Sequence, residues 1–267
     1  MQLLTPLVPD PGAPLARANP VAKLVAALAL LIVLFASLDG VTALIVLVGL
    51  ACALPFSGLS PAGLIGRGWL VGLAAVSIGV ANILFAPEQI GPIVVSLGPV
   101  RIGAETLVDG LGLAARLVAI AATGVLATAT SQPTEIADSL VQQLHASPRF
   151  AIGALAALRL VPLLAEEWQT IGMARRARGV DAGRSPVAVV RLFAGQLMAL
   201  LVGAVRRGSR MALAMEARGF GASKCRTAAR IERVTLRDLA WIAAAICLAV
   251  VAVGVSLALG TWRPLLS

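Results

Sequence analysis

The stretch LAWIAAAICLAVVAVGVSLALGTW, from Leu239 to Trp262, runs for 24 residues without a charge. A helix rises about 1.5 Å per residue, so roughly 20 apolar residues cross the hydrocarbon core of a bilayer. The whole chain of 267 residues shares this character, with 59% hydrophobic residues, 13% charged residues and a mean hydropathy of +0.93. These values exceed what a soluble domain can bury, so the sequence indicates a membrane protein.

Four further stretches without charge continue this pattern towards the N-terminus. They are residues 24–38, 40–66, 68–87 and 117–134. We therefore predict about five transmembrane helices and an all-α polytopic membrane fold. The second helix is expected to cover residues 41–54, because Pro55 and a segment rich in Ser, Gly and Pro follow it. A tight turn at Asp39 is expected to join it to the first helix.

Basic residues are concentrated in one part of the chain. Of 22 Lys and Arg residues, 15 lie between Ser131 and Thr235, together with 7 acids. The positive-inside rule places this region in the cytoplasm, and Asp39, residues 88–105 and Leu265 outside. Attraction to anionic lipids accounts for the charge, so nucleic acid is not expected as a partner. The predicted organisation is four transmembrane helices in residues 1–130, a cytoplasmic domain in residues 131–235 and a last transmembrane helix in residues 236–267.

The basic region has the periodicity of helices. We predict helices at residues 133–144, 149–178 and 186–218, because proline stands at or beside each start and apolar residues recur at helical spacing. The second and third carry long apolar stripes, which favour contact with each other or with another protein. The stripe residues singled out as this contact surface of the two long helices are Leu164, Trp168, Ile171, Phe193, Met211 and Met215.

An alternative topology would insert residues 150–165 and 192–205 into the membrane. The stretches are apolar, but as spans they would place four arginines on the outer side, namely Arg175, Arg176, Arg178 and Arg184. The positive-inside rule argues against that arrangement. We therefore expect both long helices to lie on the cytoplasmic side.

A triplet is repeated at the ends of the two long helices. Its two copies are Ala177-Arg178-Gly179 and Ala217-Arg218-Gly219. In both, the Arg continues the apolar stripe in the last helical turn, and the Gly is free to adopt the left-handed conformation that ends a helix. One such end is explained by the helix dipole, which favours a cation there by about 0.3 to 1 kcal/mol. Two ends in the same register favour paired docking elements.

Polar residues also occur near the fourth apolar stretch. Glu105, Asp109 and Arg116 fall on one stripe of a helix, which favours an intramembrane polar cluster paired within the bundle. The segment DGLGLAAR, residues 109–116, also resembles the opening motif of CDP-alcohol phosphotransferases. Its Arg comes two positions late, however, and no acid that might bind metal lies between Asp109 and Glu135. The sequence therefore favours a structural polar cluster over a phosphotransferase, and no metal site is expected.

A self-contained membrane permease is the remaining alternative. A carrier is expected to show inverted repeats, broken helices or several buried charges at the middle of the membrane. Arg116 and Asn82 alone fit such a path in this sequence, which is fewer residues than a carrier is expected to show.

The three cysteines, Cys52, Cys225 and Cys247, lack the spacing of metal ligands.

Nearly the whole chain resembles the transmembrane (T) component of energy-coupling factor transporters, bacterial importers of vitamins and metal ions related to ABC transporters. The resemblance rests on NPVAKL (residues 19–24), TATSQPTEIADSL (residues 128–140), ALRLVPLLAEEW (residues 157–168) and the two Ala-Arg-Gly triplets. The paired triplets are the specific part of it.

This resemblance implies a scaffold without enzymatic activity in the bacterial plasma membrane. It implies two ABC-type ATPase subunits in the cytoplasm and a small substrate-binding membrane protein, the S component, as partners. Any ATP is bound by the ATPases, and this chain carries no cofactor. The residues carried over as ATPase-docking are Ala177, Arg178, Gly179, Ala217, Arg218 and Gly219. Arg suits this task because its planar fork pairs with two acceptors at once.

Overall fold

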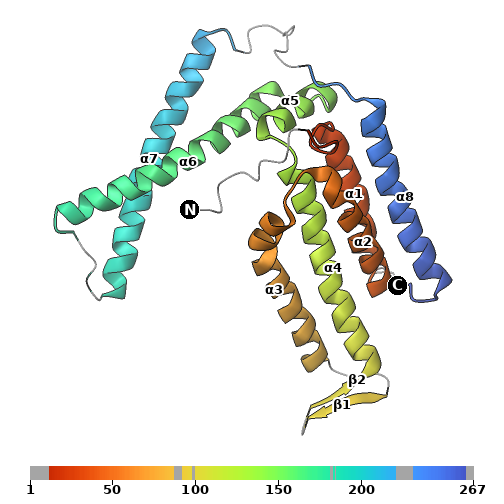
Figure 1. The fold of residues 1–267 in the computed structure, drawn as a ribbon. Helices are drawn as coiled ribbons and strands as arrows, with labels where there is room; N and C mark the ends of the chain where they lie inside the picture. Colours follow the sequence, from red (N-terminus) through yellow and green to blue (C-terminus); the bar gives the residue numbers. More distant parts are fainter. Residues whose placement is uncertain are drawn as a thin grey trace. The chain divides into compact units, whose positions relative to one another are not determined.

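The computed structural model describes residues 12–86, 92–97, 100–180, 183, 185–220 and 231–262. Its helices are α1 (Pro20–Ala36), α2 (Gly40–Ser57), α3 (Pro61–Phe85), α4 (Ala104–Ala129), α5 (Pro133–Gln143), α6 (Pro148–Ala177), α7 (Pro186–Ala217) and α8 (Leu236–Ala258) (Figure 1). The chain forms two compact units, residues 1–139 with 232–267 and residues 140–231. Arg184, Cys225 and Leu265, for which the sequence made expectations, lie outside the described residues.

The prediction of an all-α polytopic membrane protein is confirmed, with one local difference. In the segment expected to be an outer loop, β1 (Ile93–Leu97) and β2 (Val100–Gly103) pair as a short antiparallel hairpin between α3 and α4. Figure 1 shows it at the ends of these two helices. Val and Ile favour extended backbone, which explains why this connection adopts strands.

Side-chain caps define where the membrane helices begin. The Oδ1 atom of Asn19 accepts a hydrogen bond from the backbone N–H of Val21, 2.9 Å away, at the start of α1. Asp39 accepts from the backbone N–H of Thr42 at the start of α2, also at 2.9 Å. These side chains satisfy backbone donors that have no partner within the helix. The tight turn expected at Asp39 thus doubles as a helix cap.

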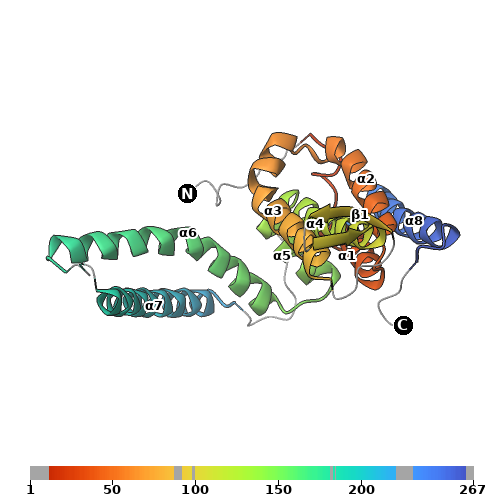
Figure 2. The same ribbon diagram turned by 90° about the horizontal axis from the view of Figure 1, so that it is seen from below.

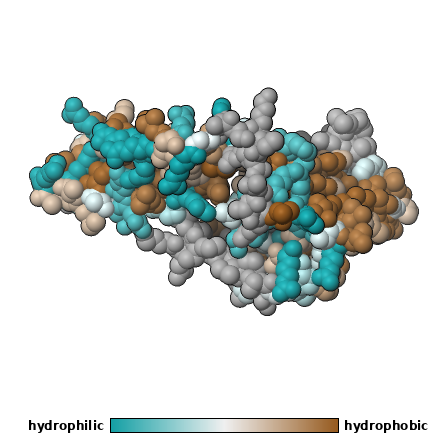
Figure 3. Space-filling view, turned by 90° about the horizontal axis from the view of Figure 1, so that it is seen from above, coloured by the Kyte–Doolittle hydropathy of each residue, from teal (hydrophilic) through white to brown (hydrophobic). Residues whose placement is uncertain are grey.

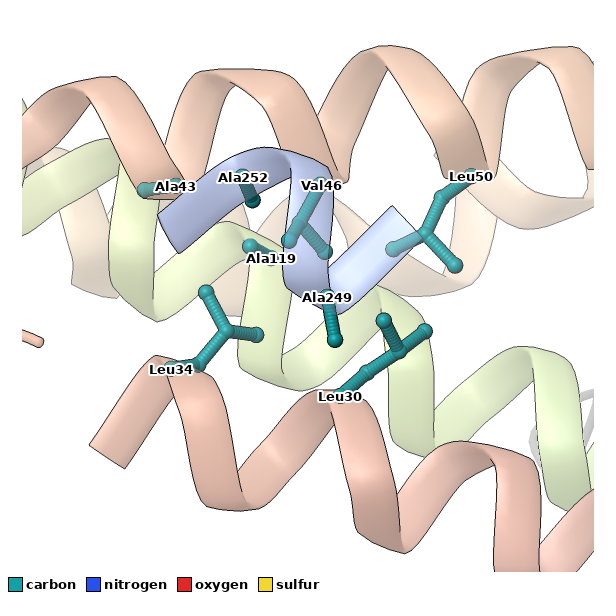
Figure 4. Close-up of a cluster of buried hydrophobic side chains, with 8 residues drawn as sticks. All are labelled: Leu30, Leu34, Ala43, Val46, Leu50, Ala119, Ala249 and Ala252. Atoms are coloured by element: carbon teal, nitrogen blue, oxygen red, sulfur yellow. The ribbon is translucent and has the colours of Figure 1, made fainter. Parts of the chain in front are cut away.

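The core of the first unit is built from α1, α2, α4 and α8. Figure 4 shows the side chains that meet there, and alanines supply half of them. The cluster consists of Leu30, Leu34, Ala43, Val46, Leu50, Ala119, Ala249 and Ala252. Small residues let helices approach closely, which supports helix association in lipid, where no hydrophobic driving force acts between them. Hydrophobic residues cover the outward side of α8 in the space-filling view (Figure 3).

Two glycine contacts bring α4 close to its neighbours. A Cβ atom at Gly40 would lie 2.9 Å from the Cα atom of Gly112, so α2 and α4 touch through their backbones. A Cβ at Gly79 of α3 would lie 2.8 Å from the carbonyl oxygen of Gly110 in α4. Side chains at these positions would separate the helices.

The end of α2 differs from the expectation. The helix continues past Leu54 and ends at Ser57, with Pro55 inside its last turn and Gly58 in the left-handed conformation at φ 69°. Proline near a helix end removes a single backbone hydrogen bond, which the rest of the helix tolerates. Gly58, not Pro55, therefore ends the helix.

Six described helices are long and apolar enough to cross a membrane by length and composition. Four of them, α2, α3, α4 and α8, match predicted spans, while α1 with its 17 residues is a shorter apolar helix. The other two are α6 and α7. Their cytoplasmic location therefore stays a prediction that rests on charge.

The three helices expected in the basic region are present with nearly the predicted bounds. Pro148 and Pro186 occupy the first turns of α6 and α7, where a missing backbone N–H costs nothing. The two helices run in roughly opposite directions and cross, as Figures 1 and 2 show. With 30 and 32 residues, α6 and α7 extend for about 45 and 48 Å.

Candidate functional site

The two Ala-Arg-Gly triplets end their helices in the same geometry. The N–H groups of Gly179 and Val180 donate to the carbonyls of Arg176 and Arg175 at 2.9 and 3.0 Å. At the end of α7, Gly219 and Phe220 donate to Glu216 and Met215, both at 2.9 Å. Each pair of bonds is a Schellman motif, in which the glycine takes a left-handed conformation, here with φ of 75° and 76°.

The arginine of each triplet is the last residue before the turn, and its side chain is exposed. Arg178 and Arg218 have nearly identical backbone angles, with φ and ψ of −88° and 7°, and −86° and 8°. Ala177, Ala217 and both glycines are exposed as well. A Cβ atom at Gly179 or Gly219 would meet nothing within 4 Å. The glycines are therefore needed for backbone conformation, and each helix presents an accessible cation at its tip.

The two tips lie at opposite ends of the α6–α7 pair. The carbonyl of Leu192, early in α7, accepts a 2.8 Å hydrogen bond from Arg175, near the end of α6. Conversely, Gly219 at the end of α7 lines a groove together with Arg149 and Gly153 at the start of α6. Arg178 and Arg218 are thus separated by most of the length of a helix.

The α6–α7 crossing is held by aromatic and polar contacts. The rings of Trp168 and Phe193 meet edge to face with centroids 5.2 Å apart. The side chain of Gln196 donates to the carbonyl of Trp168 at 2.6 Å. Such T-shaped pairs contribute about 0.5 to 1.5 kcal/mol beyond their burial. The sequence placed Trp168 and Phe193 on apolar stripes, and the structure brings them together.

A salt bridge and three glycines complete the crossing. Arg207 of α7 lies 3.0 Å from Glu167 of α6. Gly172, Gly195 and Gly203 each face a polar side chain of the other helix, which a Cβ atom would approach to between 3.0 and 3.3 Å. The sequence reasoning missed these contacts, since they depend on the register between two helices. The recurrence of small residues along α7 was the one sign in the sequence that another helix packs closely against it.

The predicted contact surface of the two long helices is only partly buried within the structure. Leu164, Trp168, Ile171, Met211 and Met215 are half-buried, whereas Phe193 is 54% exposed. None of the 32 residues of α7 is buried, although the helix is rich in Val and Leu. A groove of about 710 Å³ opens between α6 and α7, with Leu160, Met211 and Met215 in its lining. Such a large apolar surface is typical of an interaction site.

The three residues of the predicted intramembrane polar cluster differ in burial. Glu105 and Asp109 have exposed side chains in the first turns of α4, whereas Arg116 is buried. Arg116 donates to the carbonyls of Leu34 and Phe35 at 2.6 and 3.1 Å, where α1 ends. Its guanidinium thus satisfies carbonyls that lack partners within α1.

Asp39 is the acid that lies in the same buried region as Arg116, and the two interact electrostatically. Its carboxylate accepts hydrogen bonds from Ser37, Thr42 and, at 2.7 Å, Ser256 of α8. The sequence predicted a tight turn at Asp39 on the outer side of the membrane and gave no sign that the residue is buried. Its burial is explained by hydroxyl donors from Ser37, directly after α1, and from α2 and α8, which compensate the carboxylate.

Metal ligands do not gather in the described parts of the chain. Within those parts, no group of three or more His, Cys, Asp or Glu side chains is placed to hold a metal ion. Cys52 and Cys247 are free and exposed.

Comparison with known proteins gives consistent matches. The family model described as cobalt transport protein (CbiQ) matches residues 12–228. The energy-coupling factor transporter transmembrane protein EcfT of Bacillus subtilis is 34% identical over 60% of this chain and 63% of its own length. Its counterpart in Heliobacterium modesticaldum is 35% identical over 52% of this chain and 56% of its own length.

The alignments thus span less than two thirds of these relatives. The family model, in contrast, extends over most of the chain and includes both Ala-Arg-Gly triplets. The chain is therefore a multi-pass protein of the bacterial plasma membrane that belongs to the cobalt transport protein family, and it is similar to the transmembrane proteins of energy-coupling factor transporters.

Proposed function

We propose that this chain is the transmembrane coupling subunit of an energy-coupling factor transporter. In this role it transmits motion from two ABC-type ATPases to a substrate-binding membrane protein. Arg178 and Arg218 each enter a groove on one ATPase subunit. The observation that carries this proposal is the pair of matching helix ends, each with an exposed Arg before a left-handed Gly. A helix cap alone does not require the same triplet twice.

The separation of the two tips supports one ATPase for each arginine. They stand at opposite ends of helices about 45 to 48 Å long, a distance that suits two protein subunits side by side. The guanidinium pairs bidentately with carboxylate or backbone acceptors, so each contact is directional. A rigid helix between the two contacts converts a movement of one ATPase relative to the other into a change at the crossing.

The exposed apolar surface of α6 and α7 is proposed to receive the substrate-binding membrane protein. The groove between the two helices is lined by methionines and by small residues, among them Gly153, Ala156 and Ala212. Small residues permit close approach of a partner helix, and methionines adapt to different shapes. The substrate class, a vitamin or a metal ion, is set by that partner.

The buried charges of the bundle support a scaffold over a self-contained permease. Arg116 donates to two carbonyls at the end of α1, and Lys23 donates to the carbonyl of Thr130, directly after α4. Both cations thus have intramolecular partners at helix ends, and this includes Lys23, which lines a cavity of about 350 Å³ in the bundle.

Isolation of the chain from its native membrane tests this proposal. The tagged protein is purified in mild detergent, and the bound chains are identified by mass spectrometry. Two ATPase subunits and a small membrane protein are expected in stoichiometric amounts. Recovery of the chain alone, together with substrate uptake in cells that lack both ATPases, would favour the permease instead.

A further inference from the structure

The first turn of α1 lies where both connections to residues 140–231 join the membrane bundle. Thr130 and Ser131 follow α4 and lead towards that unit, while Thr235 leads back from it into α8. Lys23 and Asp238 contact these two connections, and all of these residues belong to the bundle unit. Side chains that hold both connections therefore influence how α6 and α7, the proposed coupling helices, move relative to the bundle.

Lys23 holds the connection that leaves α4. Its side chain is buried, with 5% exposure, and its Nζ atom donates to the carbonyl of Thr130 at 2.8 Å. Further hydrogen bonds of 3.2 Å reach the Oγ atom of Ser131 and the carbonyl of Ala16. An ammonium group has three donors, and all three are used here. The cation also compensates the negative end of the α4 dipole.

Asp238 holds the connection that enters α8. It is 3% exposed, and its Oδ1 atom accepts a 2.7 Å hydrogen bond from the backbone N–H of Asn19, immediately before α1. Its Oδ2 atom accepts from the backbone N–H and the hydroxyl of Thr235, both at 2.7 Å. One carboxylate therefore caps α8 and ties its first turn to the start of α1.

The two charged groups also act on each other. Asp238 and Glu135 both attract the ammonium group of Lys23. Each charge is compensated by its own hydrogen bonds, and the two residues are linked through Asn19, whose N–H donates to Asp238 and whose carbonyl accepts from the backbone N–H of Lys23. Lys23 and Asp238 therefore form one unit, which we call the connection clamp.

We propose that the connection clamp, Lys23 and Asp238, fixes both chain connections of the coupling helices to the first turn of α1, so that the two connections move together. These are positioning residues, and their purpose in transport rests on the proposed function. Without the clamp, each connection is an independent hinge. Motion of the coupling helices would then be absorbed in the connections before it reached the bundle.

Distance measurements in the full-length chain test the clamp. The native cysteines are replaced with alanine, and spin labels are placed at Phe85 of α3 and Leu213 of α7, both exposed. Pulsed electron–electron double resonance in lipid nanodiscs then reports the spread of distances between the two labels, one in each unit. We expect Lys23→Met and Asp238→Asn each to broaden this spread by at least about twofold, because one connection is released.

A second label pair separates the clamp from general stability. Labels at Phe85 and at exposed Leu259, directly after α8, both lie in the bundle unit, so their distance spread should stay as in the parent chain. Arg237→Gln serves as the matched control, because Arg237 is an exposed cation next to Asp238. It should leave both spreads unchanged.

Two results would overturn the proposal. One is an unchanged spread between the two units in both clamp variants. The other is equal broadening of both label pairs, which would mean that Lys23 and Asp238 stabilise the bundle alone. The measurement requires no ATPase, so a failure of the chain to bind ATPases would contradict the proposed function and leave the clamp standing.

Discussion

Arg207 of α7 and Glu167 of α6 form a salt bridge with 3.0 Å between Nη1 and Oε2, at the crossing of the two helices. Their side chains are 36% and 28% exposed, so solvent screens the pair. Partly exposed pairs of this kind contribute about 0.2 to 1 kcal/mol. The bridge thus selects the register of the crossing more than it stabilises the fold.

The first prediction concerns this pair. In a double-mutant cycle of Glu167→Gln and Arg207→Gln, followed by thermal unfolding of the purified chain, we expect a coupling energy of about 0.2 to 1 kcal/mol. The matched cycle uses the adjacent exposed residues Glu166 and Arg206, for which no coupling is expected. Equal coupling in both cycles would show that the bridge is not specific.

The second prediction concerns the glycines at the crossing. Gly203→Ala should weaken the α6–α7 contact, because its Cβ atom would lie 3.0 Å from Oε1 of Glu167. Gly208 lies further along α7, where a Cβ atom would meet nothing within 4 Å. Gly208→Ala should therefore raise helix stability by up to about 1 kcal/mol. Hydrogen exchange of α7 amides distinguishes the two variants, and similar protection in both would argue against close packing at Gly203.

Much of this architecture follows from local signals in the sequence. The bounds of α6 and α7 lie within one residue of those predicted, because Pro148, Pro186 and the two glycines act on the backbone beside them. The spans followed from uninterrupted apolar runs. These signals need no knowledge of distant residues.

Contacts between helices were beyond the same reasoning. The burial of Asp39 and Lys23 depends on Ser256 and Thr130, which are far away in the sequence. The pairing of Glu167 with Arg207 depends on how two helices cross. A periodic pattern predicts which face of a helix is apolar, but not the residue that it meets.

The third prediction concerns topology. In a chain without native cysteines, a cysteine at Val180, just after α6, should resist an impermeant maleimide added to intact cells, because the basic region is expected in the cytoplasm. A cysteine at Phe85, at the far end of α3, should be labelled from outside. Labelling at Val180 from outside would contradict the cytoplasmic location and favour α6 as a span.

The central claim is that Arg178 and Arg218 are docking points for two ATPases. The double variant Arg178→Glu and Arg218→Glu replaces an attractive charge at each tip with a repulsive one. Truncation of one partner in a buried charged pair costs about 2 to 5 kcal/mol, whereas a helix cap contributes less than about 1 kcal/mol. Arg206 and Arg210 are exposed on α7 away from its end, so Arg206→Glu with Arg210→Glu is the matched control.

The most direct measurement is retention of the ATPase subunits by the tagged, detergent-purified double variant, compared with the parent chain and the control pair. The account predicts that both ATPases are lost from the double variant and kept by the control, while circular dichroism shows unchanged helix content. Full retention of both ATPases by the double variant would contradict the account and reduce the two triplets to helix caps.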